Sequence, residues 1–305
     1  MRVVVIGQAA FGEAVLKRLI EDGHEVAAVS APAPTGGRAD PLWAAAESAG
    51  IPAVATEELR TPEGVERWRS FAPELAVMAF VTAILPEEVF AIPAKGTIQY
   101  HPSLLPKHRG SSAINWAIIF GENVTGLTIF WPDKGIDTGP ILLQEAVEIA
   151  PDDTVGSLYF QKLFPMGVDA VSRAVRMVEE GTAPRIPQNH AEATYEPPCT
   201  EEHGRILWFE PAERVYARIR GCNPQPGAWT EFEGARLRIF DCRLERRLEP
   251  GMPGRVLEVA EDGFTVRLNG GVLRVLRVQP PEGPKVNAGE WARSAGLRAG
   301  YRFRP

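Results

Sequence analysis

The sequence lacks the long hydrophobic runs of a membrane protein and the cysteine pattern of a secreted one. Its longest uncharged apolar stretch, Leu75 to Leu85, is far shorter than the roughly 20 residues that a membrane-spanning helix needs. The opening MRVVVIGQAAFG has too short an apolar run for a signal peptide. The three cysteines, Cys199, Cys222 and Cys242, are too few and too widely spaced for a disulfide framework. We therefore expect a cytoplasmic protein with reduced thiols and no membrane partner.

The motifs of several enzyme classes are also missing. Gly7 and Gly12 follow the first apolar run with the spacing GxxxxG instead of GxGxxG, and no Lys-Ser/Thr pair completes a phosphate-binding loop. No GxSxG sequence provides a serine nucleophile. Cys199 and His203 form a lone CxxxH, which is far short of the four ligands of a structural zinc site. The sequence therefore predicts neither a bound nucleotide nor a metal.

Length and charge indicate two domains with different surfaces. A chain of 305 residues is long for a single core. From Gly204 onward, 18 Lys and Arg face 12 Asp and Glu, whereas the preceding part has 15 against 27. The asymmetry is explained either by solubility alone or by an anionic partner of the basic part, such as a folate tail, a carrier arm or RNA.

The first part of the chain has the pattern of a β-α-β unit. An apolar run at Val3 to Ile6 is followed by helical spacing over Glu13 to Glu21 and a second run at Val26 to Val29. Leu75 to Phe80 is apolar throughout, as in a parallel strand that is buried on both faces. Thr97 to Tyr100 predicts the next strand. These runs indicate a parallel sheet.

The pattern changes in the second part. We expect one long helix over Thr154 to Glu180, then a Pro-rich segment, and from Ala228 short alternating strands with glycine turns, as in a small OB-like β-barrel. The predicted fold class is therefore α/β, a Rossmann-like parallel sheet with helices on both faces followed by a small OB-like β-barrel domain. The predicted limits are 1–188 for the catalytic domain, 189–205 for a linker and 206–305 for the barrel domain.

Two loops carry the candidate chemistry. His101 follows the strand at Thr97 to Tyr100, and Asp137 lies between two glycines in a second loop. A histidine can donate a proton or stabilise an oxyanion, and an aspartate can orient the histidine or take a proton from an amine or water. Gln99 projects from the same strand face as His101, so its amide can donate to an oxyanion. The set predicts acyl transfer by direct attack.

Less specific interpretations exist for the same residues. A histidine after a strand is commonly a surface residue, and an aspartate between glycines is commonly a turn residue. We expect three further histidines, His24, His108 and His190, on the surface, with His108 close enough to touch the first loop.

Several stretches together resemble a known family. They are YHPSLLPKHRGSSAINW (Tyr100 to Trp116), FWPDKGIDTGPILLQ (Phe130 to Gln144), PDDTVGSLY (Pro151 to Tyr159) and RIRGCNPQPGAWTEFEG (Arg218 to Gly234). The chain resembles the 10-formyltetrahydrofolate-dependent formyltransferase family over nearly its whole length. That family includes methionyl-tRNA, sugar-amine and glycinamide ribonucleotide formyltransferases. The likeness is strong to the formyl hydrolase domain of 10-formyltetrahydrofolate dehydrogenase.

The resemblance implies an enzyme that uses 10-formyltetrahydrofolate as formyl donor, without metal or nucleotide. His101 would be the catalytic histidine, which stabilises the formyl oxyanion and donates a proton. Asp137 would orient and deprotonate water or the acceptor. The folate site would be formed by residues of two apolar stretches, which are Ala83, Ile84, Leu85, Ser103, Leu104, Leu105 and Pro106.

Gln99 departs from the family pattern. The resemblance places Asn there in most transferases and an apolar residue in the hydrolase domain. Glutamine keeps the amide donor and adds a methylene, so the balance between transferase and hydrolase stays open.

The formyl acceptor also stays open among water, a small amine or amino sugar, a carrier arm and tRNA. The loop APAPTGGRADPL has a single basic residue, Arg38, whereas RNA binding needs several phosphate contacts, so tRNA is disfavoured. No DNA partner is expected. A non-catalytic folate-binding protein and a Rossmann oxidoreductase are alternatives from other classes, and the missing middle glycine argues against the second.

Overall fold

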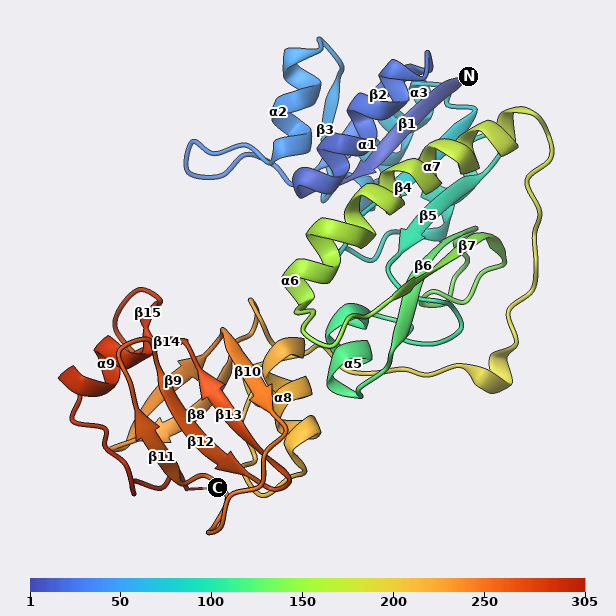
Figure 1. Ribbon diagram of the computed structural model, residues 1–305. Coiled ribbons are helices and arrows are strands. Elements are labelled where there is room, and N and C mark those ends of the chain that lie inside the picture. Colours follow the sequence, from blue (N-terminus) through green and yellow to red (C-terminus); the bar gives the residue numbers. More distant parts are fainter. Residues whose placement is uncertain (305) are drawn as a thin grey trace. The chain divides into compact units, whose positions relative to one another are not determined.

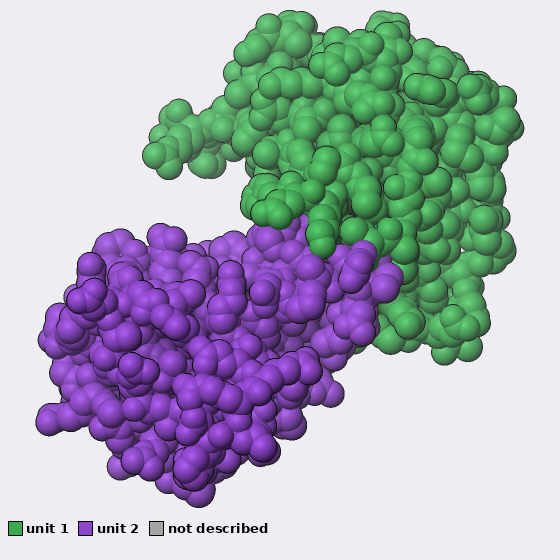
Figure 2. All heavy atoms as spheres, viewed as in Figure 1, with its two compact units in different colours: residues 1–111, 126–147, 160–196 green, residues 112–125, 148–159, 197–305 purple. Residues whose placement is uncertain are grey.

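The computed structural model describes residues 1–304, which form two compact units (Figures 1 and 2). Unit 1 comprises residues 1–111, 126–147 and 160–196, and unit 2 comprises residues 112–125, 148–159 and the chain from 197 onward. The domain limits predicted from the sequence, 1–188, 189–205 and 206–305, are not tested by this division into units and remain a proposal. No helix of the described residues has both the length and the apolar character needed to cross a bilayer.

Unit 1 is built on a seven-stranded sheet of order β3-β2-β1-β4-β5-β6-β7. The first five strands in sequence run parallel, and β6 is antiparallel to β5. The strands are β1 (Arg2–Gly7), β2 (Glu25–Ala31), β3 (Ala53–Ala55), β4 (Leu75–Ala79), β5 (Thr97–His101), β6 (Val124–Phe130) and β7 (Ile141–Glu148). The helices are α1 (Ala9–Glu21), α2 (Pro41–Ser48), α3 (Pro62–Ser70), α4 (Glu87–Ala91) and α7 (Phe164–Glu179).

Helices cover both faces of this sheet because its central strands are apolar on both sides. In β1, Val3 and Val5 belong to a core that also holds buried residues of α1, α2 and α7. The alternate residues Val4 and Ile6 belong to a second core, which includes Trp68 of α3. This is the arrangement that the uninterrupted apolar runs predict.

Gly7 ends β1 where two strands approach closely. A Cβ atom at this position would lie 2.2 Å from the carbonyl oxygen of Ala79, which ends the neighbouring β4. Only glycine fits such an approach. The glycine that resembles part of a nucleotide motif therefore has a packing reason.

The predicted helix over Thr154 to Glu180 is interrupted in the structure. It consists of α6 (Val155–Leu158), a π-helical turn (Tyr159–Leu163) and α7. Pro165 stands in the first turn of α7 and has no N–H to donate to the preceding turn. The apolar spacing continues across such a bulge, so periodicity alone did not reveal it.

Unit 2 contains helices and two four-stranded antiparallel sheets, of order β10-β13-β12-β11 and β15-β14-β9-β8. The helices are α5 (Ala113–Ile119), α6, α8 (Ala212–Gly221) and α9 (Ala288–Ser294). The strands are β8 (Ala228–Phe232), β9 (Ala235–Ile239), β10 (Cys242–Glu245), β11 (Val256–Val259), β12 (Phe264–Leu268), β13 (Gly271–Val275), β14 (Arg277–Gln279) and β15 (Val286–Asn287). The predicted fold class, a parallel-rich α/β sheet followed by an antiparallel β domain, is confirmed.

Candidate active site

His101 is the last residue of β5, at the carboxyl edge of the parallel strands. Its side chain is buried, with 5% of the residue exposed. The ring nitrogen Nε2 donates a hydrogen bond of 2.7 Å to the carbonyl oxygen of His108. A carbonyl only accepts, so this contact assigns a proton to Nε2 and leaves Nδ1 as the nitrogen available for chemistry.

Asp137 meets His101 from the loop between β6 and β7. Its Oδ2 lies 3.5 Å from His101 Nδ1 and accepts a 2.7 Å hydrogen bond from the backbone N–H of Gly110. Asp137 is 8% exposed and has a left-handed backbone with φ of +53°. The structure therefore brings the two predicted catalytic side chains together in a buried place.

The loop that carries His108 is held by the end of unit 1. His108 is 4% exposed, its N–H donates to Thr194 Oγ1 at 2.8 Å, and its Nδ1 lies 3.1 Å from Glu196 Oε2. The expectation of a surface His108 was wrong, because this ring packs between its own loop and residues 194–196. His108 thus positions the carbonyl oxygen that fixes the His101 ring.

The predicted folate loop from Ser103 to Pro106 is anchored to the sheet. Ser103 is fully buried, and its hydroxyl donates to the carbonyl oxygen of Lys107 at 2.7 Å. Leu105 is also buried, and its N–H donates to Thr128 Oγ1 at 3.1 Å. Leu104 and Pro106 are half-buried. The anchored residues fix the shape of the loop, and its half-buried members keep some solvent-accessible surface.

The other predicted binding residues form the loop after β4. Leu85 is buried, Ala83 is half-buried, and Ile84 is 79% exposed. Among residues 1–304, the backbone groups from Val81 to Leu85 form no hydrogen bonds with other backbone groups. The loop therefore offers an exposed apolar side chain and available backbone donors and acceptors.

Gln99 lies in the middle of β5 and is half-buried. Within the described chain, its side-chain amide has no hydrogen-bond partner. An amide that the protein leaves unpaired has hydrogen-bonding capacity to spare.

Two residues that the sequence did not single out support the Asp137 loop. Gln188 is 5% exposed, and its Nε2 donates to the carbonyl oxygens of Asp137 and Gly139 at 2.9 and 2.7 Å. Its Oε1 accepts two hydrogen bonds from Arg109, which is 2% exposed. Arg109 lies within the stretch from Tyr100 to Trp116 that carries the family resemblance, but Gln188 stands in a Pro-rich segment without periodicity and gave no signal.

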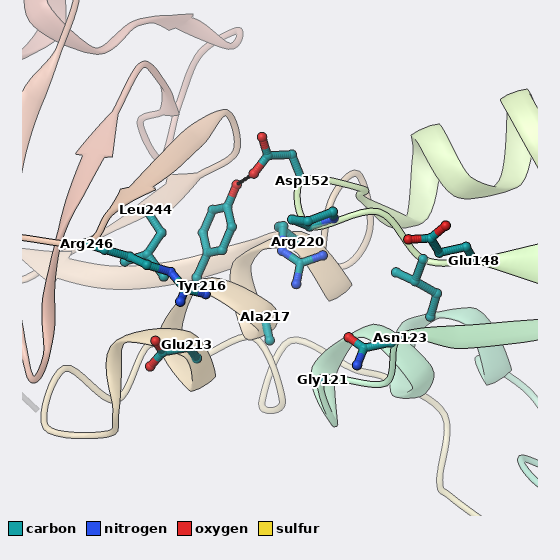
Figure 3. Close-up of a pocket in the computed structure, with 12 residues that line it drawn as sticks. Gly121, Asn123, Glu148, Asp152, Glu213, Tyr216, Ala217, Arg220, Leu244 and Arg246 are labelled. Atoms are coloured by element: carbon teal, nitrogen blue, oxygen red, sulfur yellow. Dashed lines mark hydrogen bonds between the residues drawn. The ribbon is translucent and has the colours of Figure 1, made fainter.

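A pocket of 350 Å³ lies elsewhere, and its lining consists of unit 2 residues alone (Figure 3). Two of its polar lining residues have hydrogen-bond partners within the unit. Tyr216 donates from its hydroxyl to Asp152 Oδ1 at 2.7 Å, and Arg220 donates to the carbonyl oxygen of Asp153 at 2.7 Å. Burial raises the pKa of Tyr216 and lowers the pKa of Arg220. His101 and Asp137 belong to unit 1, so the pocket is not their site.

The described residues also contain no group of three or more His, Cys, Asp or Glu side chains arranged to hold a metal ion. The candidate set is a histidine, a carboxylate and a neutral amide near the carboxyl edge of an α/β sheet. Such a set is suited to transfer of an acyl group to a nucleophile.

Comparison with known proteins identifies the family. Residues 1–175 match the family described as formyl transferase, and residues 198–296 match the formyl transferase C-terminal domain. The chain belongs to the formyl transferase family, as the sequence resemblance predicts.

Two curated relatives and one solved structure illustrate the match. The cytosolic 10-formyltetrahydrofolate dehydrogenase of Xenopus laevis is 40% identical over 97% of this chain, which covers only 34% of that protein. The methionyl-tRNA formyltransferase of Moorella thermoacetica is 38% identical over 92% of both chains. HypX from Aquifex aeolicus in complex with tetrahydrofolic acid shares the fold, with a TM-score of 0.71, 21% identity, and coverage of 97% of this chain and 47% of that one.

Proposed function

We propose that this chain cleaves the formyl group from 10-formyltetrahydrofolate and passes it to water or to an amine. The observation that carries the proposal is the buried pair of His101 and Asp137, 3.5 Å apart, in a chain of the formyl transferase family. The chain spans about a third of the first curated relatives it matches, so their full activities are not transferred to it.

The proposed reaction begins with the nucleophile. Asp137 accepts a hydrogen bond from Gly110 on the same oxygen that faces His101, which fixes the direction of its carboxylate. The carboxylate takes a proton from water or an amine as that group attacks the formyl carbon. The new bond from oxygen or nitrogen to carbon converts the formyl oxygen into an oxyanion.

His101 and Gln99 act on the oxyanion and on the leaving nitrogen. The Gln99 amide donates to the oxyanion, and protonated His101 Nδ1 stabilises the same charge. The bond between the formyl carbon and N10 of the folate then breaks, and N10 receives the proton of His101. The proton that Asp137 collected returns to His101 Nδ1, so the enzyme ends in its starting state. The products are tetrahydrofolate and either formate or a formylated amine.

The residues near the pair fit a flat, partly polar ring. Ile84 offers exposed apolar surface, and the adjacent backbone groups are free to hydrogen bond. We propose that Ala83, Ile84 and Leu85 contact the pterin ring, and that the loop of Ser103, Leu104, Leu105 and Pro106 supports it from the sheet.

The test is incubation with 10-formyltetrahydrofolate, with mass spectrometry of formate and of formylated products in a metabolite extract. Formate alone would identify a hydrolase, and a formylated amine would identify a transferase. Absence of both in the presence of a broad acceptor mixture would refute the proposed function.

A second candidate acceptor is methionyl-tRNA, because the Moorella relative matches this chain nearly from end to end. The loop of residues 31–42 argues against it, since Thr35 and Arg38 close a tight turn with a single basic side chain. Formylation of initiator methionyl-tRNA, measured beside the metabolite extract, separates the two acceptors.

A further inference from the structure

The carboxamide of Gln188 uses all of its hydrogen-bonding capacity between two loops. Its two N–H groups serve the carbonyl oxygens of Asp137 and Gly139, and its oxygen takes two N–H groups of Arg109. The Arg109 contacts, at 3.2 Å from Nε and 2.7 Å from Nη2, both end on the single oxygen Oε1. A single buried amide thus joins the loop before Gly110 to the loop that carries Asp137.

The Arg109 end of this connection is itself fixed. Arg109 Nη1 donates to the Tyr195 hydroxyl at 2.5 Å, and Nη2 lies 3.0 Å from His190 Nδ1. Its backbone N–H donates to the carbonyl oxygen of Thr194 at 3.0 Å. Arg109 also directly follows His108, whose carbonyl oxygen holds the His101 ring. The arrangement therefore links the supports of both reactive side chains.

The Asp137 loop needs such support because its backbone is strained. Asp137 is a non-glycine residue with φ of +53°, a conformation that persists only where the surroundings fix it. At Gly139, a Cβ atom would lie 1.8 Å from the carbonyl oxygen of Trp131, so the turn closes tightly. The hydrogen bonds from Gln188 reach the carbonyl oxygens of these two residues.

We propose that Gln188 is a positioning residue that holds the Asp137 carboxylate at its working distance from His101, with Arg109 as the fixed end of the connection. Gln188 lies between residues 175 and 198, outside both family matches. The inference rests on the proposed function, because its effect is measured on formyl release. The segment between residues 175 and 198 would thus contribute to catalysis by positioning Asp137, without contacting the substrate.

Gln188→Glu is the sharpest variant. A carboxylate keeps the shape and strengthens the pairing with Arg109, but it has no N–H for the carbonyl oxygens of Asp137 and Gly139. We expect kcat to fall about 10- to 100-fold, because small displacements of a reacting group have effects of this size. The Kd for tetrahydrofolate, measured by fluorescence titration, should stay within about threefold of the wild type.

A double-mutant cycle separates positioning from general damage to the structure. In the background of Asp137→Asn, where the proton acceptor is already lost, Gln188→Glu should reduce the residual rate by less than about twofold. Losses that multiply in the double variant would mean that Gln188 acts independently of Asp137, which would overturn the proposal. If Gln188→Glu does not fold, Gln188→Met removes the same donors without adding a charge and carries the same expectations.

The matched control is Asn189→Asp, the same amide-to-acid change one residue along the chain. Asn189 is exposed, and its Oδ1 accepts from the N–H of Ala191, a contact that the aspartate retains. The aspartate loses only the hydrogen bond from Nδ2 to Glu192 Oε1, which is exposed to solvent. Its kcat should equal that of the wild type. A wild-type rate for folded Gln188→Glu would refute the positioning role alone, whereas an inactive wild-type protein would refute the proposed function.

Discussion

His101 Nδ1 lies 3.5 Å from Asp137 Oδ2, just beyond the range of a strong hydrogen bond. Both side chains have a firmer contact elsewhere, His101 through Nε2 and Asp137 through the N–H of Gly110, each at 2.7 Å. The protein thus fixes each group by its own hydrogen bond, and no strong hydrogen bond joins the two side chains.

We expect His101→Ala to lower formyl release by about 10²- to 10⁴-fold, because the variant loses the proton donor for N10. Binding of tetrahydrofolate should persist, and titration of its fluorescence change measures it. His24→Ala is the control, since His24 precedes β2 at the amino edge of the parallel strands. Normal turnover by His101→Ala would contradict the assignment.

Asp137→Asn should reduce the rate by a similar factor for a different reason. The amide oxygen still accepts from Gly110, but the group no longer takes a proton from the nucleophile. Rates in single-turnover experiments with 10-formyltetrahydrofolate should fall while the bound fraction stays unchanged. Asp137→Ala should be equally inactive, and activity in either variant would exclude the carboxylate as the base.

Gln99→Asn should retain part of the activity, because the shorter side chain keeps the amide donor. Gln99→Leu removes the donor at nearly constant volume and should lose about 10²- to 10³-fold in kcat, as expected for an oxyanion donor. The kcat values of the two variants are compared under saturating donor. Complete inactivity of Gln99→Asn would mean that the added methylene is required for reach.

Cys199 should react with iodoacetamide before the other two cysteines. The hydrogen bond from the Cys222 thiol, helped by the positive charge of Arg218, lowers the pKa of Cys199, so more thiolate exists at a given pH. The pKa of Cys222 is raised by the same hydrogen bond and by burial, and burial raises the pKa of Cys242 to about 12. Peptide mass spectrometry after labelling at about pH 7.5 measures the order. Equal labelling of all three thiols in the folded protein would contradict it.

The sequence was sufficient to place His101 at a strand end, because the end of a strand can be predicted from local apolar spacing. The apolar run at Thr97 to Tyr100 predicts β5, and β5 ends at His101. The general rule that ligands bind at the carboxyl ends of parallel strands then makes His101 a candidate site residue.

The same rule does not explain Asp137. Because β6 is antiparallel to β5, with Gln99 beside Phe130 and His101 beside Thr128, the carboxyl end of β6 points away from His101. Asp137 reaches the histidine only because the loop between β6 and β7 folds back, and Gly139 and Gln188 help to hold that path. Such a path depends on tertiary hydrogen bonds between distant residues, which leave no periodic trace in a sequence.

The contacts of Gln188 and Glu196 also determine where a junction can be placed when chimaeric enzymes are built on this fold. The sheet and its covering helices are complete at the end of α7, yet residues 188–196 supply hydrogen bonds to His108 and to the backbone carbonyl of Asp137. A chimaera joined directly after α7 would keep the sheet and helices but lose the hydrogen bonds from residues 188–196 to the His108 and Asp137 loops. A junction placed after Glu196 would transfer the scaffold together with the residues that hold the His108 and Asp137 loops in place.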